Sequence, residues 1–176
     1  MSKTIVINHI PQVVTNARLW KTDIDRNIFI ATKENIKDII NIEHICFNPI
    51  YYDSLLTESS IKYIITAGNS LLIINKFGEK IAGYAQISFN KSLPSARFYS
   101  LAVLPEFQGK AAANLLFRSV ERISQIIGAN AILLEIREDN KALRYRYTKI
   151  GYVQYKVIKN YYPDGCSAIK MRKKLP

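Results

Sequence analysis

The sequence predicts an α/β protein of the mixed α+β kind: a single domain with a mixed, mostly antiparallel central sheet and helices on both faces. Three observations support this fold class. The chain has 176 residues, which suits one domain with a sizeable core. Strand-type and helix-type apolar patterns follow one another in the order β-α-α-β-β-β-α-β-α-β-β. This order combines hairpins with crossover connections, as a mixed sheet covered by helices requires.

The first 27 residues differ from the rest of the chain. Residues 1–27 show weak periodicity, mixed charge and one Pro, so they predict an arm or extra strand outside a main domain at 28–176. A short β-rich run over 28–31 follows, and Thr32 is suited to cap a helix that continues to about residue 47. Asn48-Pro49 ends that helix, because the residue before a proline disfavours the helical conformation.

Periodicity and turn residues predict the remaining elements. Apolar side chains at helical spacing indicate helices, and β-rich runs bounded by Gly, Asn or Pro indicate strands. The predicted helices cover 52–66, 111–127 and 140–150, and the predicted strands cover 71–75, 80–89, 96–104, 131–137, 152–158 and 166–173.

Composition limits the functional classes. Hydrophobic residues make up 48% of the chain, but no apolar run reaches the roughly 18 to 20 residues that cross a bilayer, and no cleavable signal pattern opens the sequence. Cys46 and Cys166 lack paired spacing, which predicts small core residues rather than a disulfide or a zinc cluster. His9 and His44 are isolated, so we expect no metal site. A soluble, cytoplasmic protein without a membrane partner is expected.

The segment from Val103 to Ala113 carries the strongest functional signal. It ends an apolar strand, passes through a polar turn and opens a helix with Gly and Ala. The start of a helix presents unpaired N–H groups and the positive end of the helix dipole, so this segment predicts a seat for a diphosphate. Gln108-Gly109-Lys110-Ala111-Ala112-Ala113 resembles the Gln/Arg-x-x-Gly-x-Gly/Ala signature of the GCN5-related N-acetyltransferases (GNAT), which holds the diphosphate of coenzyme A.

Three further pieces resemble the RimI-like branch of this superfamily, which acetylates the N-terminal alanine of ribosomal proteins. Ser100-Leu101-Ala102-Val103 resembles its central strand. Leu134-Glu135-Ile136-Arg137, with Asn140, Tyr147 and Gly151-Tyr152, resembles its LEVR…N…LY…GF segment. Asn160-Tyr161-Tyr162-Pro163 with Asp164-Gly165 resembles its NYYP…DG loop. The resemblance covers about residues 99–171.

The resemblance implies acetyl-CoA as cosubstrate and a set of residues that bind it. Backbone N–H groups of the central strand would bond the pantetheine and the thioester oxygen, and the helix start would carry the diphosphate. The implied cofactor-binding residues are Leu101, Ala102, Val103, Gln108, Gly109, Lys110, Ala111, Ala112, Ala113, Asn114 and Asn140. Asn140 also suits a helix cap, and capping alone would explain it.

The resemblance also implies two catalytic residues. Glu135 stands at the position of the family's glutamate base and is the only ionisable residue in the apolar run 131–136; partial burial would raise its pKa and make it a better base. The alternative is a carboxylate paired with Arg137 or Lys170. Tyr147 stands where the family has the tyrosine that protonates the coenzyme A thiolate, with Tyr145 as the lesser candidate. Packing alone is the alternative for both tyrosines.

Two tyrosines are candidates for contact with the acceptor, and two positions differ from the family's pattern. Tyr161 and Tyr162 could form a wall of the acceptor groove, and they could equally well only cover the edge of the sheet. Ala111 replaces the first motif glycine; we expect it to be helical and therefore harmless, since a φ above zero would strain it. Cys166-Ser167 replaces an acidic pair of the family and makes the acceptor edge less acidic.

The basic excess predicts an anionic ligand or partner. Lys and Arg total 25 against 14 acidic residues, a formal charge of +11. Part of this charge suits coenzyme A and the rest could favour ribosomes. A solvated basic surface is the alternative. Direct nucleic-acid binding is not expected, since the basic and aromatic residues are not interleaved as in a nucleic-acid module.

The resulting functional prediction is an N-acetyltransferase that moves an acetyl group from acetyl-CoA to the α-amino group of a protein, such as a ribosomal protein, in a monomeric or dimeric enzyme. One alternative is a GNAT enzyme that acts on a small amine or a lysine side chain. Another is a non-catalytic protein that binds acyl-CoA, or that holds nucleic acid or associates with ribosomes through its basic surface.

Overall fold

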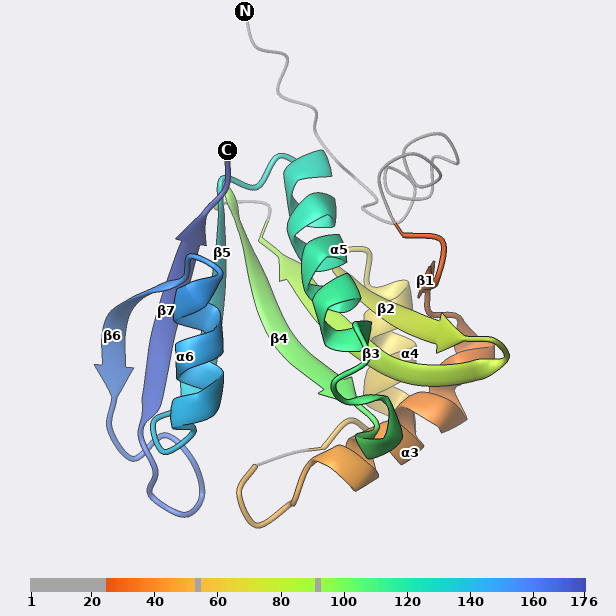
Figure 1. The fold of residues 1–176 in the computed structure, drawn as a ribbon, viewed down its shortest axis with the longest axis horizontal. Coiled ribbons are helices and arrows are strands. Elements are labelled where there is room, and N and C mark those ends of the chain that lie inside the picture. Colours follow the sequence, from red (N-terminus) through yellow and green to blue (C-terminus); the bar gives the residue numbers. More distant parts are fainter. Residues whose placement is uncertain (1–24, 53–54, 91–92) are drawn as a thin grey trace, which may run out of the picture.

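The computed structural model describes residues 25–52, 55–90 and 93–176, and its sheet has the strand order β1-β2-β3-β4-β5-β7-β6 (Figure 1). Neighbouring strands are antiparallel except β4 and β5, which are parallel. The strands are β1 Ile28–Ile30, β2 Ser70–Phe77, β3 Lys80–Phe89, β4 Ser95–Val103, β5 Ala131–Arg137, β6 Val153–Ile158 and β7 Ala168–Lys174. The helices are α3 Ile36–Cys46, α4 Glu58–Thr66, α5 Ala112–Ile126 and α6 Lys141–Lys149. The predicted fold class and element order are confirmed.

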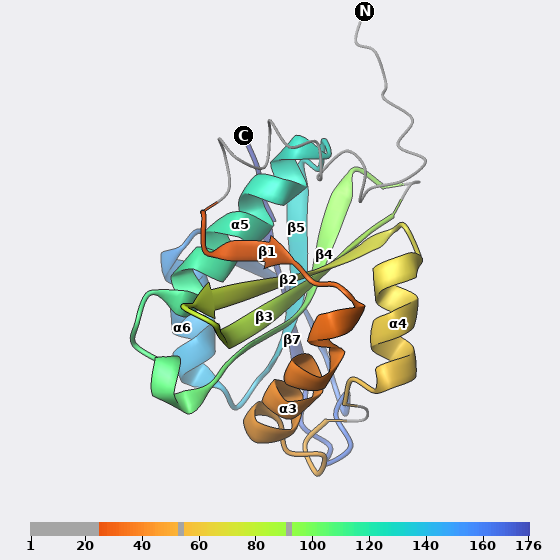
Figure 2. The same cartoon turned by 90° about the vertical axis from the view of Figure 1, so that its right-hand side faces the viewer.

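Helices cover both faces of the sheet, and each face has its own core (Figure 2). On one face, α3 and α4 bury Ile39 and Ile61 against Leu72 and Tyr84. On the other face, α5 buries its apolar stripe, which includes Leu116, against the strands, and part of α6 joins the same cluster. Burying these stripes stabilises the helices, because an isolated helix of this length is marginal in water.

The predicted helix over 52–66 starts too early. The helix begins at Glu58, after Thr57 and Ser60 form a capping box in which each side chain accepts the other residue's N–H. This box fixes the helix start. Leu55 and Leu56 precede it in a non-helical segment, although their spacing had suggested a helical face.

The expected arm at 1–27 lies almost wholly outside the described residues. Of this segment the structure describes Asp25 to Asn27, which run beside β2: the Asn27 carbonyl accepts hydrogen bonds from the Lys76 N–H at 2.9 Å and from the Asn75 amide at 3.3 Å. A further correction concerns Cys46 and Cys166. Both are half-buried free thiols; Cys46 packs against the core under α3 and α4, whereas Cys166 belongs to neither core cluster.

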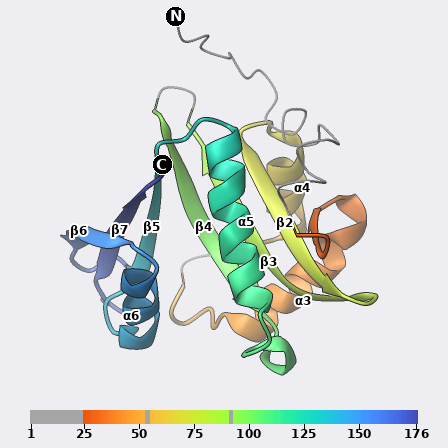
Figure 3. The ribbon, with the colours of Figure 1, turned by 45° about the horizontal axis from the view of Figure 1, so that its top comes forward.

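Strands β4 and β5 pair only where they begin. Their register joins 95–97 to 131–133, and beyond Arg97 no further pair forms. At this point Tyr99 is an extra residue in β4, since Ile87 opposes Phe98 and Gln86 opposes Ser100. Such a β-bulge bends its strand. The two strands then diverge toward their carboxyl ends, as Figure 3 shows.

None of the helices among the described residues is long and apolar enough to span a membrane.

Candidate active site

A pocket of about 390 Å³ lies where β4 and β5 diverge. Its lining comes from both sides of the sheet. Glu43, Phe47 and Leu56 belong to α3 and the segment that follows it, whereas Phe117 and Tyr147 belong to α5 and α6. The pocket therefore passes through the plane of the sheet, and a ligand on one face could meet a ligand on the other within it.

The diverging part of β4 leaves backbone groups available to this pocket. The Leu104 N–H bonds the Ala82 carbonyl of β3 at 2.9 Å, and Ala102 is paired with Tyr84. Because N–H groups alternate between the two edges of a strand, those of Leu101 and Val103 point to the opposite edge, where β5 no longer pairs. Ala102 itself is buried in the core under α3 and α4, so its N–H and side chain lie away from the pocket.

The predicted diphosphate loop forms a turn next to this edge. Gln108 donates a hydrogen bond from Nε2 to the Val103 carbonyl at 3.0 Å, which ties the turn to the end of β4. Helix α5 begins at Ala112. Among the described residues, no backbone hydrogen bond uses the N–H groups of Gly109, Ala111, Ala113 and Asn114. With Lys110 beside them, these donors suit an anion, as at other helix starts.

The expectation that Ala111 is helical is wrong. Its φ of 40° and ψ of −18° place it in the left-handed region, directly before the first residue of α5. Gly109, two residues earlier, has φ of +80°. The chain needs both conformations to turn from the 3-10 segment Pro105–Phe107 into the helix, and only Gly adopts them without cost.

Ala111→Gly is therefore expected to stabilise the protein. The left-handed conformation costs an L-residue about 1–2 kcal/mol, and the greater freedom of Gly in the unfolded chain cancels part of the gain, so the free energy of unfolding should rise by about 0.5–1 kcal/mol. Urea unfolding measures this. Ala113→Gly, inside the helix, is the control and should lower stability by up to about 1 kcal/mol. Equal destabilisation by both substitutions would refute the strained conformation.

Glu135 lines the pocket between two cations. Its side chain is 11% exposed, and its oxygens lie 3.1 Å from Arg97 and 3.1 Å from Lys170. The sequence alternative of an ion pair with Lys170 is thus present, and the alternative with Arg137 is not. Arg97 was missed, because it is distant in sequence and its strand position suggests no role.

Tyr147 also lines the pocket, from the opposite face of β5. Leu134 and Ile136 belong to the same core cluster as Tyr147, so Glu135, which alternates with them, points to the other face. The Tyr147 ring packs edge-on between Phe117 and Tyr152 at centroid distances of 5.3 and 5.2 Å.

Burial raises the pKa of Tyr147 above its ordinary value, so the phenol keeps its proton at neutral pH. Tyr145, the lesser candidate, is 65% exposed and does not line the pocket.

The two predicted asparagines occupy supporting positions. Asn140 lines the pocket and caps α6, since its side chain accepts the Leu143 N–H at 3.0 Å. Asn114 accepts a hydrogen bond from Arg146 at 2.8 Å. Arg146 lines the pocket and thereby links the start of α5 to the pocket wall on α6.

Aromatic rings form the wall of the pocket on the α3 side. Tyr161 and Tyr162 line it, and Phe47 and Tyr52 join them. Contacts run from Phe47 to Tyr52 at 5.2 Å, from Tyr52 to Tyr162 at 5.9 Å and from Tyr162 to Tyr161 at 5.1 Å between ring centroids. We call these four residues the aromatic wall. Phe47 and Tyr52 could not be assigned to it from their helical spacing.

Glu43 was also missed by the sequence prediction. It is a buried carboxylate of α3 that accepts hydrogen bonds from the Tyr84 hydroxyl and, at 3.0 Å, from the Leu56 N–H. The second bond fixes the non-helical segment before α4 against the pocket. In sequence, Glu43 simply looks like a polar residue of an amphipathic helix.

The structure thus brings together some of the predicted residues and not others. Those that line the pocket are Leu101, Glu135, Asn140, Tyr147, Tyr161 and Tyr162. The diphosphate-loop residues and Val103 lie beyond its edge. No group of His, Cys, Asp and Glu within the described part of the chain could hold a metal ion.

The chain is similar in sequence to known acetyltransferases. The family model described as acetyltransferase (GNAT) domain matches residues 41–175. An uncharacterised N-acetyltransferase of Methanocaldococcus jannaschii is 38% identical over 151 residues, which cover 84% of this chain and 92% of that protein. The [ribosomal protein bS18]-alanine N-acetyltransferase of Haemophilus influenzae is 37% identical over 71 residues, 40% of this chain and 48% of that enzyme. The second match spans only about half of that relative.

Solved structures show the same fold. The ribosomal-protein-S18-alanine N-acetyltransferase of Escherichia coli superposes with a TM-score of 0.72 at 21% identity, covering 84% of this chain and 92% of that one. A Salmonella typhimurium structure with its cofactor acetyl-CoA has a TM-score of 0.70 at 16% identity, covering 85% and 93%. With the family model matching most of its length, the chain belongs to the GNAT family of acetyltransferases and is an acyltransferase.

Proposed function

We propose that the protein transfers an acetyl group from acetyl-CoA to the α-amino group at the N-terminus of a protein. The observation that supports this most strongly is the pocket through the sheet, with Glu135 on one face and Tyr147 on the other. An acyl donor and an amine could approach from opposite faces and react between a base and an acid.

The residues at the start of α5 fit the donor. The unpaired N–H groups of Gly109, Ala111, Ala113 and Asn114, with the Lys110 ammonium, would hold the diphosphate. The β4 edge at Leu101 and Val103 would bond the pantetheine arm and the thioester oxygen. Acetyl-CoA, when bound, supplies the activated acetyl group.

Each step then has a residue on this chain. Glu135, directly or through a water, would take the proton from the acceptor ammonium, whose pKa of about 7.7–8.0 is far below the 10.4 of lysine. The N–H groups at Leu101 and Val103 would stabilise the charge that develops on the carbonyl oxygen. As the C–N bond forms and the C–S bond breaks, the Tyr147 hydroxyl would donate its proton to the departing thiolate. The second proton that the amine nitrogen loses on becoming an amide would restore the phenol. Before the amine binds, Arg97 and Lys170 compensate the negative charge of Glu135.

We further propose that the acceptor resembles a ribosomal protein with a small first residue. The relatives from Haemophilus influenzae and Escherichia coli are both named as alanine N-acetyltransferases of a ribosomal protein. The aromatic wall beside Glu135 would receive an extended peptide end and exclude water. The formal charge of +11 suits an acceptor near ribosomal RNA and makes a polyamine a poor substrate.

Acetylation of short peptides tests this proposal. Peptides that begin with Ala or Ser should release coenzyme A thiol in the presence of acetyl-CoA and the enzyme. The same peptides with a blocked N-terminus are the matched control and should give no release. Turnover confined to blocked peptides that contain lysine would refute acetylation of the α-amino group.

A further inference from the structure

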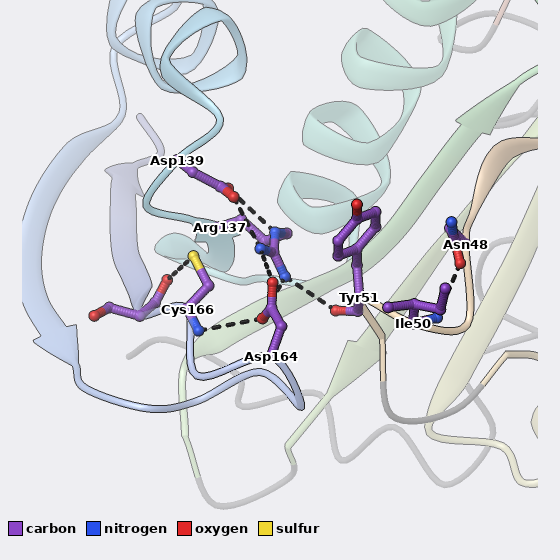
Figure 4. Close-up of polar contacts among 8 residues, drawn as sticks. Asn48, Ile50, Tyr51, Arg137, Asp139, Asp164 and Cys166 are labelled. Carbon is purple, nitrogen blue, oxygen red and sulfur yellow. Dashed lines mark hydrogen bonds and ion pairs between the residues drawn. The ribbon is translucent and has the colours of Figure 1, made fainter.

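Arg137 uses all of its hydrogen-bonding capacity beside the pocket (Figure 4). Its guanidinium donates to both carboxylate oxygens of Asp139 at 3.1 and 2.8 Å and to both of Asp164 at 3.1 and 2.6 Å. A fifth bond goes to the Tyr51 carbonyl at 3.1 Å. Arginine has five N–H donors, so each one has a partner. The side chain is only 8% exposed.

These bonds join three separate segments of the chain. Arg137 is the last residue of β5, Asp164 lies in the loop between β6 and β7, and Tyr51 follows α3. The guanidinium also stacks on the Tyr51 ring at 5.2 Å and on the Tyr162 ring at 4.9 Å. Among the strand pairings of the described residues, none joins the loop of Asp164 to the segment of Tyr51. Arg137 therefore connects two segments that the sheet leaves apart.

The same two segments carry the aromatic wall. Tyr52 is adjacent to Tyr51, and Tyr162 precedes Asp164 by two residues. The contact that joins the two halves of the wall is the edge-to-face pair of Tyr52 and Tyr162 at 5.9 Å. One such ring pair contributes only about 0.5–1.5 kcal/mol beyond its buried area, so it cannot hold two loops in register by itself.

We infer that Arg137 is a positioning residue for the acceptor: it holds the two halves of the aromatic wall together before the peptide binds. This inference rests on the proposed function. Arg137 does not contact Glu135, which Arg97 and Lys170 hold instead, so its effect reaches the reaction through Tyr52 and Tyr162.

The positive charge of Arg137 is more than compensated, because two carboxylates, Asp139 and Asp164, bond one guanidinium. Hydrogen bonds from its guanidinium hold the pKa values of Asp139 and Asp164 below their usual range, so both stay ionised at neutral pH. Arg137 therefore acts by holding its hydrogen-bond partners in place and does not offer a free positive charge to a ligand. Lysine could keep the charge but not the two bidentate pairs, because its ammonium has three donors and no planar fork.

Steady-state kinetics with an Ala-peptide tests the inference. Arg137→Lys is expected to raise the KM for the peptide at least about tenfold and to leave the KM for acetyl-CoA within about twofold, because only the acceptor side is displaced. Asp164→Asn should act in the same direction, since it removes the link to the loop. Glu138→Gln is the matched control: this carboxylate is exposed, is adjacent to Arg137 in sequence and does not line the pocket, so its replacement should leave both KM values unchanged.

Hydrogen exchange of the free enzyme supplies a second readout that needs no turnover. Arg137→Lys and Asp164→Asn should both speed exchange in 47–52 and in 160–167, and Glu138→Gln should not. An unchanged peptide KM in Arg137→Lys, or a loss shared equally by peptide and acetyl-CoA, would overturn the inference. If the natural enzyme acetylated no peptide while exchange responded as expected, the coupling of the two segments would stand, and the proposed acceptor would be wrong.

Discussion

Glu135→Gln is expected to lower kcat on an Ala-peptide by about 100-fold at pH 7, the lower range for loss of a general base. The amide has the same shape but cannot accept the amine proton. The deficit should shrink as the pH rises above about 8, because the α-amine then loses its proton without help. Thiol release measured from pH 6 to pH 9.5 gives both the loss of kcat at pH 7 and its decrease at higher pH.

Glu138→Gln is the control for this experiment. Glu138 is exposed, carries the same charge three residues further on, and does not line the pocket. Its replacement should leave kcat and the pH profile unchanged. If Glu135→Gln kept the pH profile of the natural enzyme, Glu135 would not be the base, and its ion pairs with Arg97 and Lys170 would be only structural.

Tyr147→Phe should lower kcat by about 100-fold with little change in the KM for either substrate. The substitution removes one oxygen and keeps the ring between Phe117 and Tyr152. Without the hydroxyl, the thiolate leaves unprotonated, so the loss falls on the chemical step. Pre-steady-state and steady-state thiol release with a saturating peptide distinguish this loss from a change in binding.

The pH dependence adds a separate check on Tyr147. Burial raises the pKa of its phenol, so the acid form persists into the alkaline range in which the acceptor amine is neutral. Activity of the natural enzyme should therefore rise to about pH 8 and stay level toward pH 10 rather than fall as an ordinary tyrosine ionises. Tyr145→Phe, on the exposed side of α6, should change nothing. Full activity of Tyr147→Phe would exclude it as the acid.

Much of the fold could be predicted because local pattern decides it. Strand β5 was predicted with its correct ends, since an apolar run rich in β-formers lies between turn residues. Helix α5 was predicted to within one residue, since its apolar stripe and Gly128 mark both ends. The start of α4 was predicted wrongly. The capping box at Thr57 and the contact of the preceding segment with the pocket wall determine where the helix begins, and the apolar spacing of Leu55 and Leu56 indicates neither of them.

The sequence could not reveal the pocket residues whose partners lie far away along the chain. Glu135 and Tyr147 belong to a recognisable local segment and were predicted from it; both line the pocket. Arg97 lies 38 positions before Glu135 and becomes its partner only when β4 and β5 pair side by side. The sequence indicates Arg137 only as an alternative partner for Glu135, because Tyr51 and Asp164 reach it through tertiary structure. The left-handed conformation of Ala111 depends on the turn that precedes the helix, and the residue type alone does not determine that turn.

The proposed reaction requires the donor and the acceptor to meet in the pocket between β4 and β5. A crystal structure with a bisubstrate, in which coenzyme A is joined through an acetyl group to the α-amine of an Ala-peptide, tests this most directly. We expect the diphosphate on the N–H groups from Gly109 to Asn114, the acetyl group between Glu135 and Tyr147, and the peptide against Tyr52 and Tyr162. A bisubstrate bound with both halves on one face of the sheet, or away from β4, would contradict it.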